Sequence, residues 1–318
     1  MKLEKISLLR FDTEYLAHPT DLIDEGKEVQ KKLEALGIKV VNPFERQQDS
    51  PQEWWQTPHS PEDAKRVVER DLAWIRSCDG LFAYNPDTLK LCGTAMEIFY
   101  ASKLLGKPEF IFTSKKYRFH PWLMYFGQIF TDMDLALDVL KLRKKIEGYA
   151  FRMALAGKMG SGKSTVSDFL IKSFQFKQYS FASKLKEIAT DLFNMEVKDR
   201  VLLQMLGTRV REIEQDAWVN YVLKQLNAEA PLRAVIDDMR YLNESEILRE
   251  NGFTLIKLEA PLSTRNKRGV EGLNEATAMH PSEVELDNIN YDYVIDSSGT
   301  IEDSYKEIMK ILEEVAEK

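Results

Sequence analysis

Hydrophobic and polar positions divide the first half of the chain into alternating strand-like and helix-like segments. Short apolar runs predict strands, and apolar residues at helical spacing predict the helices between them. Such alternation favours an α/β fold with a parallel sheet covered on both faces. The expected strands are Ile6–Phe11, Ile38–Val41, Gly80–Tyr84 and Glu109–Thr113, and the expected helices are Leu22–Leu36, Glu62–Ser77, a helix after Gly93, and Asp132–Glu147.

Two of these helices carry a further expectation about their faces. Apolar residues between Ala64 and Ile75 share one side of their helix, so we expect that side to be buried. The basic run Lys141–Lys145 is most simply a solvated helix face.

The same alternation returns after Gly148, a plausible hinge. Strands are expected at Arg152–Ala156, Ala234–Asp237, Phe253–Leu258 and Tyr291–Asp296, and a helix is expected to end the chain. The polar stretch Pro261–His280 is typical of a mobile flap. The fold class is therefore α/β, with two doubly wound parallel-sheet domains at residues 1–148 and 149–318.

Length and charge narrow the classes of function. A chain of 318 residues has room for about two domains. Its formal net charge of -7 argues against broad binding to nucleic acid polymers or anionic membranes, although small phosphorylated ligands need only a local basic pocket. No apolar run approaches the ~20 residues of a membrane helix, and Cys78 and Cys92 are too few for a disulfide framework. We expect a cytoplasmic protein.

The segment Gly157–Thr165, GKMGSGKST, fits the phosphate-binding pattern G-x-x-x-x-G-K-[ST]. An apolar strand precedes it and a helical segment follows it, which is the context that this motif requires. Backbone N–H groups of such a loop surround phosphate oxygens, the lysine reaches the β and γ phosphates, and the following hydroxyl binds Mg²⁺. The motif predicts binding of ATP and Mg²⁺ by Gly157, Lys158, Gly160, Ser161, Gly162, Lys163, Ser164 and Thr165.

Charged residues further along supply candidates for the rest of this site. Asp237 and Asp238 follow a strand, where a carboxylate beside the loop could hold Mg²⁺ directly or through water, and Arg240 could clamp an acceptor phosphate. Closure of the flap would bring Arg265 and Arg268 to the transferred phosphoryl group. Further candidates for substrate binding lie on helical segments between the loop and this strand: Lys184, Arg209 and Arg211.

In the first half, Gly93, Thr94 and Glu97 open an apolar helix just after the strand Gly80–Tyr84. Thr-x-x-Glu before an apolar run is the capping-box pattern, so Glu97 could be only a cap. It also lies just beyond the carboxyl end of a strand, where ligands bind in parallel sheets. The turn at Gly93 and Thr94 and the amides behind it could hold a sugar hydroxyl or a 5′-phosphate.

Residues 150–318 resemble the deoxynucleoside monophosphate kinases of bacteriophages. The resemblance rests on GKMGSGKST, FASKLKE, LLQMLGTRVRE with DAWVN, VIDDMRYLNE, RNKRG and HPSE, which follow one another in the expected order. It implies phosphoryl transfer from ATP to a dNMP, with Asp238 and Arg240 on the acceptor side. By the same resemblance, Arg211, Asp216 and Trp218 help to form the acceptor pocket. The preferred base stays open.

Residues 5–140 resemble the nucleoside 2-deoxyribosyltransferases and the related nucleoside 5′-monophosphate N-glycosidases, through the segment from Glu69 to Pro108 and through HPWLMYFG. This resemblance implies that Glu97 is the nucleophile and that Asp71 handles the leaving base. Transferases of free nucleosides often have an acidic residue where Leu91 stands, which favours a nucleotide ligand or a hydrolase. Cytokinin-nucleotide phosphoribohydrolases share Gly-Thr-x-x-Glu, but their preceding Pro-Gly-Gly is absent.

Together the two resemblances imply a Rossmann or flavodoxin-like domain followed by a P-loop NTPase kinase, both acting on small nucleosides or nucleotides. Relatives of the first domain are often oligomers, so a homo-oligomer is conceivable, and a phage-encoded chain would work in the host cytoplasm. Two alternatives stay open. The first domain could be a non-catalytic nucleotide sensor attached to the kinase, and the second could be an ATP-driven switch that hydrolyses ATP without an acceptor.

Overall fold

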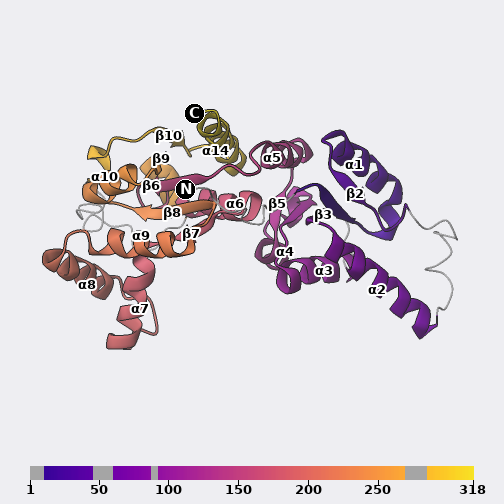
Figure 1. The fold of residues 1–318 in the computed structure, drawn as a ribbon, viewed down its shortest axis with the longest axis horizontal. Helices are drawn as coiled ribbons and strands as arrows, with labels where there is room; N and C mark the ends of the chain where they lie inside the picture. The colour runs from indigo at the N-terminus through magenta and orange to yellow at the C-terminus, as the bar shows by residue number, and fades with distance from the viewer. Residues whose placement is uncertain (1–10, 46–59, 87–91, 269–284) are drawn as a thin grey trace. The chain divides into compact units, whose positions relative to one another are not determined.

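The chain folds into two compact units, residues 1–148 and 149–318, and each contains a five-stranded parallel sheet (Figure 1). The predicted α/β class with two parallel sheets is confirmed. No helix in the described part of the chain has the length and apolar character needed to cross a membrane. The computed structural model describes residues 11–45, 60–86, 92–268 and 285–318.

The sheet of the first unit has the strand order β2-β1-β3-β4-β5, which is the order of flavodoxin-like folds. Its strands are β1 (Thr13–Ala17), β2 (Lys39–Val41), β3 (Gly80–Asn85), β4 (Glu109–Thr113) and β5 (Gln128–Phe130). Its helices are α1 (Ile23–Ala35), α2 (Pro61–Ser77), α3 (Cys92–Phe99) with the π-helical segment η2 (Tyr100–Leu104), α4 (Pro121–Phe126) and α5 (Met133–Lys145), with 3₁₀ turns η1 (Thr20–Leu22) and η3 (Lys115–Tyr117).

The first strand does not lie where the sequence predicted it. The expected strand was Ile6–Phe11, whereas β1 covers Thr13–Ala17, and residues 6–10 lie outside the described residues. A search for apolar runs does not find this strand, because Glu14 interrupts the run with a carboxyl group that is buried in the core. Burial raises the pKa of Glu14 to about 7, while the charge of Arg143 opposes that rise.

The helix faces also differ from expectation. Only Ile75 of α2 is buried, Val67 and Leu72 are half-buried, and Val68 is 55% exposed, so the described residues cover the expected apolar face of α2 only in part. On α5 the reverse occurs. Arg143, expected on a solvated face, is 1% exposed, and its guanidinium lies 3.4 Å from the ring centre of Phe11 and 5.2 Å from that of Phe110. The long cationic side chain of Arg143 therefore occupies a position in the core next to two aromatic rings.

The sheet of the second unit has the strand order β10-β9-β6-β8-β7. Its strands are β6 (Phe151–Ala156), β7 (Lys177–Tyr179), β8 (Arg233–Met239), β9 (Thr254–Glu259) and β10 (Tyr293–Asp296). Its helices are α6 (Lys163–Phe174), α7 (Phe181–Phe193), α8 (Arg200–Ile213), α9 (Ala217–Glu229), α10 (Leu242–Glu250), α11 (Leu262–Lys267), the 3₁₀ turn η4 (Glu285–Asn288) and α14 (Ile301–Ala316). The short strands β5 and β7 had no sequence signal strong enough to predict them.

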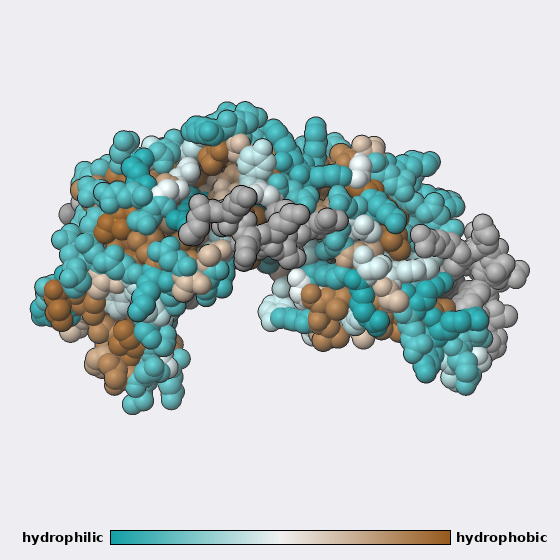
Figure 2. All heavy atoms as spheres, in the orientation of Figure 1, coloured by the Kyte–Doolittle hydropathy of each residue, from teal (hydrophilic) through white to brown (hydrophobic). Residues whose placement is uncertain are grey.

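Helices α7 and α8 extend away from the sheet of the second unit (Figure 1), and apolar side chains gather over their outer ends (Figure 2). The exposed apolar residues on this pair of helices and their connection are Leu192, Phe193, Val197, Val201, Met205 and Ile213. Because α7 follows β7 directly, the pair begins at the carboxyl edge of the sheet, where it can border a ligand cavity. The expected flap is partly helical, since α11 occupies its start, and residues 269–280 of it lie outside the described residues.

Glu109 opens β4 as a carboxyl group with 2% exposure. Burial raises its pKa to about 9, against a smaller opposing effect of the Ser102 backbone. The folded protein therefore keeps Glu109 protonated at neutral pH, whereas the unfolded chain ionises near pH 4.5. A raised pKa in the folded state means that stability falls as the pH rises from about 4.5 towards 9.

We therefore expect Glu109→Gln to stabilise the first unit at pH 8, because glutamine has no proton to lose. The gain in unfolding free energy should be on the order of 5 kcal/mol and should vanish near pH 4. Thermal and urea unfolding across this pH range would measure it, with the exposed Glu69→Gln as the control. Equal stability of wild type and Glu109→Gln at pH 8 would contradict a buried, protonated Glu109.

Candidate active sites

The first candidate site centres on Glu97, which α3 carries just past the carboxyl end of β3. Tyr15, from the middle of β1, donates its hydroxyl to Glu97 Oε1 at 2.6 Å. Tyr15 is fully buried, and burial together with the Glu97 carboxylate raises the pKa of the tyrosine, so its hydroxyl remains a proton donor. The Glu97 carboxylate is therefore directed at the sheet.

This geometry does not fit the capping alternative. Thr94 is buried inside α3, which begins at Cys92, so Thr94 and Glu97 do not bracket the helix start as a capping box requires. Gly93 and Thr94 were expected in a turn before the helix, and both belong to its first turn. The preceding residues 87–91, Leu91 among them, lie outside the described residues.

Asp71 reaches the same site from α2. Arg70 donates to Asp71 Oδ1 from both Nε, at 3.0 Å, and Nη2, at 2.8 Å. The Arg70 guanidinium also lies 4.5 Å from the centre of the Trp74 ring, one helical turn along. The arginine is thus fixed on two sides, and it binds one oxygen of the carboxylate.

The electrostatics of Glu97 and Asp71 are coupled. Burial raises the pKa of Glu97 to about 7, the hydrogen bond from Tyr15 lowers it, and the negative charge of Asp71 raises it further. Burial also raises the pKa of Asp71, against the opposing effect of Arg70. The charge of Asp71 therefore acts on Glu97, and burial favours the protonated form of both carboxyl groups. Two neighbouring carboxyl groups with raised pKa values can take different roles, one attacking as the carboxylate and the other donating a proton.

Sequence reasoning missed Tyr15 and Arg70. Tyr15 belongs to a strand that was predicted at the wrong place, and a tyrosine in a core strand carries no functional signal of its own. Arg70 directly precedes Asp71 on a polar stretch of α2. Adjacent residues on a helix usually point in different directions, so nothing in the sequence indicated that they pair.

The second candidate site is built on the loop between β6 and α6. Gly157, Gly160 and Gly162 have φ angles of 144°, 81° and 92°, which favour glycine over other residues. A Cβ at Gly157 would lie 2.3 Å from the Leu258 carbonyl oxygen, so the close approach of the loop to β9 also requires glycine. Lys163 Nζ donates to the carbonyl oxygen of Gly157 at 2.5 Å, which folds the side chain back over its own loop.

The two aspartates at the end of β8 have different surroundings. Asp238 accepts hydrogen bonds from Ser180 Oγ at 2.6 Å and from the backbone N–H groups of Phe181 and Ala182, and so caps the start of α7. Asp237 accepts from Gln178 Nε2 at 2.9 Å; burial and the charge of Asp238 raise its pKa, and Lys163 lowers it. Asp237 therefore feels the charge of the loop lysine, and both residues line the same cavity.

A cavity of about 660 Å³ lies beside the loop, between β8, α7 and α8. Several predicted site residues line it: Lys163, Ser164, Arg211, Trp218, Asp237, Asp238 and Arg240. Trp218 does so as a core side chain, buried to 5% exposure, with its ring N–H donating to the Gly207 carbonyl oxygen. Asp216 accepts from Asn243 at 2.8 Å and does not line the cavity.

Two predicted substrate residues point elsewhere. Lys184 pairs with Glu187 at 2.5 Å, and Arg209 pairs with Glu212 at 2.6 Å, each within its own helix. Neither lines the cavity. Their assignment to substrate binding stays a prediction, because helical periodicity alone does not say which side of α7 and α8 faces the loop.

The flap arginines also take positions that differ from the expectation. Arg265 donates to the Met159 carbonyl oxygen at 3.1 Å, and Arg268 donates to those of Gly160, at 2.8 Å, and Ser297. Both therefore fasten α11 to the backbone of the phosphate-binding loop. Arg265 belongs to the lining of a second cavity, of about 490 Å³, together with Lys158 and Ser161.

Arg211 and Glu244 form the most buried ion pair of this site. Glu244 has 2% side-chain exposure and accepts from Arg211 Nη2 at 3.0 Å and from the backbone N–H groups of Arg240 and Tyr241. The Arg211 guanidinium lies 4.0 Å from the Tyr241 ring centre. Glu244 thus holds the chain that leaves β8 in place, and sequence reasoning missed it.

The residues present fit ATP and Mg²⁺. The glycine loop has the backbone freedom to surround phosphate oxygens, and Lys163 stands at its end. Ser164 and Asp237 border the same cavity, and an oxygen donor set of hydroxyl, carboxylate, water and phosphate is the one that Mg²⁺ prefers. These two residues would hold the ion.

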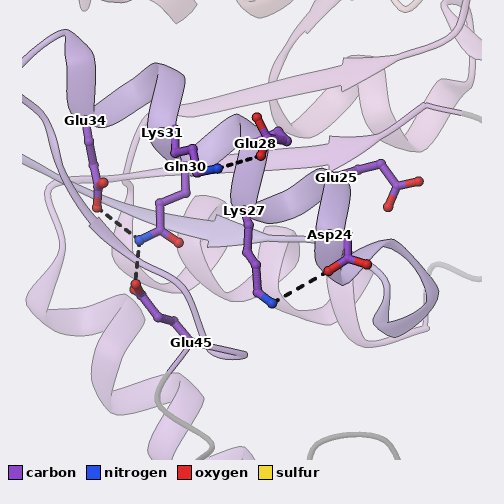
Figure 3. A pocket seen from close by; sticks show the side chains of 8 residues that line it. All are labelled: Asp24, Glu25, Lys27, Glu28, Gln30, Lys31, Glu34 and Glu45. Carbon is purple, nitrogen blue, oxygen red and sulfur yellow. Dashed lines mark hydrogen bonds and ion pairs between the residues drawn. The ribbon is translucent and has the colours of Figure 1, made fainter.

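A further cavity, of about 630 Å³, runs along α1 in the first unit. Most of its polar side chains contact one another (Figure 3): Lys27 pairs with Asp24, Lys31 with Glu28, and Gln30 donates to Glu34 and Glu45. Because most of these charged groups pair with a neighbour, we assign no function to this cavity.

Comparison with known proteins finds relatives of two kinds. The family model of nucleoside 2-deoxyribosyltransferase matches residues 15–168, past the end of the first unit and into α6. A protein of Acanthamoeba polyphaga mimivirus described as a deoxynucleotide monophosphate kinase is 28% identical over 199 residues, covering 52% of this chain and 97% of its own length. The dephospho-CoA kinase of Aquifex aeolicus is 26% identical over 193 residues, with the same two coverages.

Two solved structures are also similar. A 2-deoxyribosyltransferase from Bacillus psychrosaccharolyticus is 24% identical with a TM-score of 0.34, covering 40% of this chain and 90% of that one. TT1252 from Thermus thermophilus is 18% identical with a TM-score of 0.35, covering 52% and 98%. The recognition expected from the sequence, a deoxyribosyltransferase-like part followed by a kinase-like part, is confirmed. The chain is an enzyme of nucleotide metabolism.

The contacts of Glu97 predict opposite effects of two conservative substitutions on its pKa. Tyr15→Phe removes a hydrogen bond to the ionised carboxylate, so the pKa of Glu97 should rise above about 7. Asp71→Asn removes a neighbouring negative charge, so the same pKa should fall. Carboxyl ¹³C titration by NMR would measure both, with Glu69→Gln as the control. A shift in the same direction in both variants would contradict the described geometry.

Proposed function

We propose that the second unit transfers the γ-phosphoryl group of ATP to the 5′-phosphate of a deoxynucleoside monophosphate. The observation that carries this proposal is the glycine loop ending in Lys163 beside a cavity lined by cations. An acceptor phosphate oxygen forms a bond to the γ phosphorus as the bond to the β–γ bridging oxygen breaks, giving ADP and dNDP. Lys163 and Arg240 would stabilise the negative charge on the transferred group.

Ser164 and Asp237 would hold Mg²⁺, which would supply positive charge to neutralise the phosphates. The name of the mimivirus relative supports a deoxynucleotide acceptor. The contacts of Arg265 and Arg268 with the loop backbone support a role in holding the loop in shape.

For the kinase, Lys163→Met should lower the rate of dNDP formation by at least 100-fold, because the charge that meets the β and γ phosphates is lost. The full chain would be incubated with ATP, Mg²⁺ and each of the four dNMPs, and dNDP would be separated by chromatography. Arg209→Met, outside the cavity, should match wild type. Hydrolysis of ATP at the same rate with and without every dNMP, and no dNDP, would favour the ATP-driven switch instead.

We propose that the first unit breaks the N-glycosidic bond of a deoxynucleoside or deoxynucleotide. The observation that carries this second proposal is the coupled pair Glu97 and Asp71, with Tyr15 donating to Glu97. The Glu97 carboxylate attacks C1′ of the sugar, the C1′–N bond breaks, and the departing base takes a proton from Asp71. Water or a second base then releases the sugar from Glu97, which gives hydrolysis or transfer respectively.

The pKa of Glu97 sets the expected pH dependence of this reaction. The attacking form is the carboxylate, so kcat/KM should rise with pH through about 7. Glu97→Gln should reduce base release by at least 1,000-fold, and Glu69→Gln should leave it unchanged. Product analysis over all nucleosides and dNMPs, with and without added free base, would measure this. If wild type binds nucleotides but releases no base from any of them, the sensor alternative is favoured.

A further inference from the structure

Cationic side chains concentrate in the cavity beside the phosphate-binding loop. The chain as a whole carries a net charge of -7, yet six cations and three carboxylates line this one cavity. Three of the cations have already been described: Lys163 in the loop, Arg211 in its ion pair with Glu244, and Arg240 directly after β8. The others are Lys186, Lys198 and Arg200, which sequence reasoning did not single out.

Three separate parts of the second unit bring these cations together. Lys186 lies on α7, Lys198 in the connection to α8, and Arg200 in the first position of α8. Arg200 Nη1 lies 4.0 Å from Met159 Sδ, which places it against the phosphate-binding loop. Burial lowers the pKa of Lys198, and the charges of Lys186, Arg200 and Arg240 lower it further. These cations are therefore close enough to repel one another.

The carboxylates of the cavity do not neutralise this cluster. Asp238 is used by the start of α7, and Glu244 by Arg211 and two backbone N–H groups. Asp237 lies towards Lys163 and Gln178. The first N–H groups of α7 are already bonded to Asp238, so that helix start does not serve an anion. An anion that enters the cavity must therefore be met by the side-chain cations.

We propose that Lys186, Lys198 and Arg200 bind the phosphate group of the acceptor, a phosphomonoester dianion, next to Arg240. The identity of the ligand as an acceptor rests on the proposed kinase function; the anion site itself rests on the cavity. A dianion between these side chains converts mutual repulsion into charge-assisted hydrogen bonds. It also explains the chemical choice of acceptor, because a nucleoside without a phosphate would leave the cluster unneutralised.

Matched variants on one helix provide the test. Lys186 lines the cavity, whereas Lys184, two residues earlier, pairs with Glu187 outside it. Both positions tolerate methionine without loss of a buried contact, since neither lysine is buried. The thermal midpoint of the full chain would be measured with inorganic phosphate and with chloride at the same ionic strength, in the absence of ATP.

Phosphate should raise the midpoint of wild type and of Lys184→Met equally, and the rise should be at least halved in Lys186→Met and Lys198→Met. In the kinase assay the same two cavity variants should increase KM for the dNMP about tenfold, the loss of one charge-assisted hydrogen bond, with kcat changed less than threefold. Lys184→Met should leave both parameters unchanged.

The two proposals fail in different ways. If phosphate stabilises the chain through Lys186 and Lys198 but the chain forms no dNDP, the anion site is supported and the proposed kinase function is wrong. An active kinase in which phosphate stabilises all variants equally, or does not stabilise wild type, overturns the anion site alone. A loss in Lys184→Met as large as in Lys186→Met would also overturn it, because the effect would then be one of overall charge.

Discussion

Parallel pairing of strands is the constraint on which both candidate sites depend. In a parallel sheet every strand ends at the same edge, so groups far apart in sequence meet there without any contact between their helices. In the first unit, Glu97 follows β3, and its side chain reaches back to Tyr15 in the middle of the paired strand β1. In the second unit, the loop after β6 lies beside Asp237 at the end of β8, again on a paired strand.

Each site then uses burial for its chemistry. Removal of the Glu97 carboxylate from water raises its pKa towards neutrality, and the hydroxyl of Tyr15 limits that rise. The nearby Asp71 is held by an arginine that is itself stacked on Trp74. The second site does not depend on burial of one group. It is an open cavity lined by cations, whose charge an anionic ligand would neutralise. This contrast supports the two proposed activities, proton and glycosyl transfer at the first site and phosphate binding at the second.

Most of the fold was readable from the sequence. Apolar runs and glycine positions located most strands of both sheets, and the glycine pattern with its flanks located the loop between β6 and α6. The errors have a common cause. β1 was misplaced because Glu14 is a charged residue type inside a core strand, and Arg143 was assigned to solvent because a basic run is usually exposed. β5 and β7 have only three residues each, too few for a period to emerge.

The sequence by itself determined the alternation of most strands and helices, the glycine loop between a strand and a helix, and the position of Glu97 after a strand. Tertiary structure alone decided which side chains face those groups: Tyr15 reaches Glu97, Asp238 is used by the start of α7, and Lys186 lines the cavity while Lys184 does not. The physical reason is that motifs record backbone conformation and local spacing. The direction of a side chain from a helix depends on how that helix packs, which only the folded chain specifies.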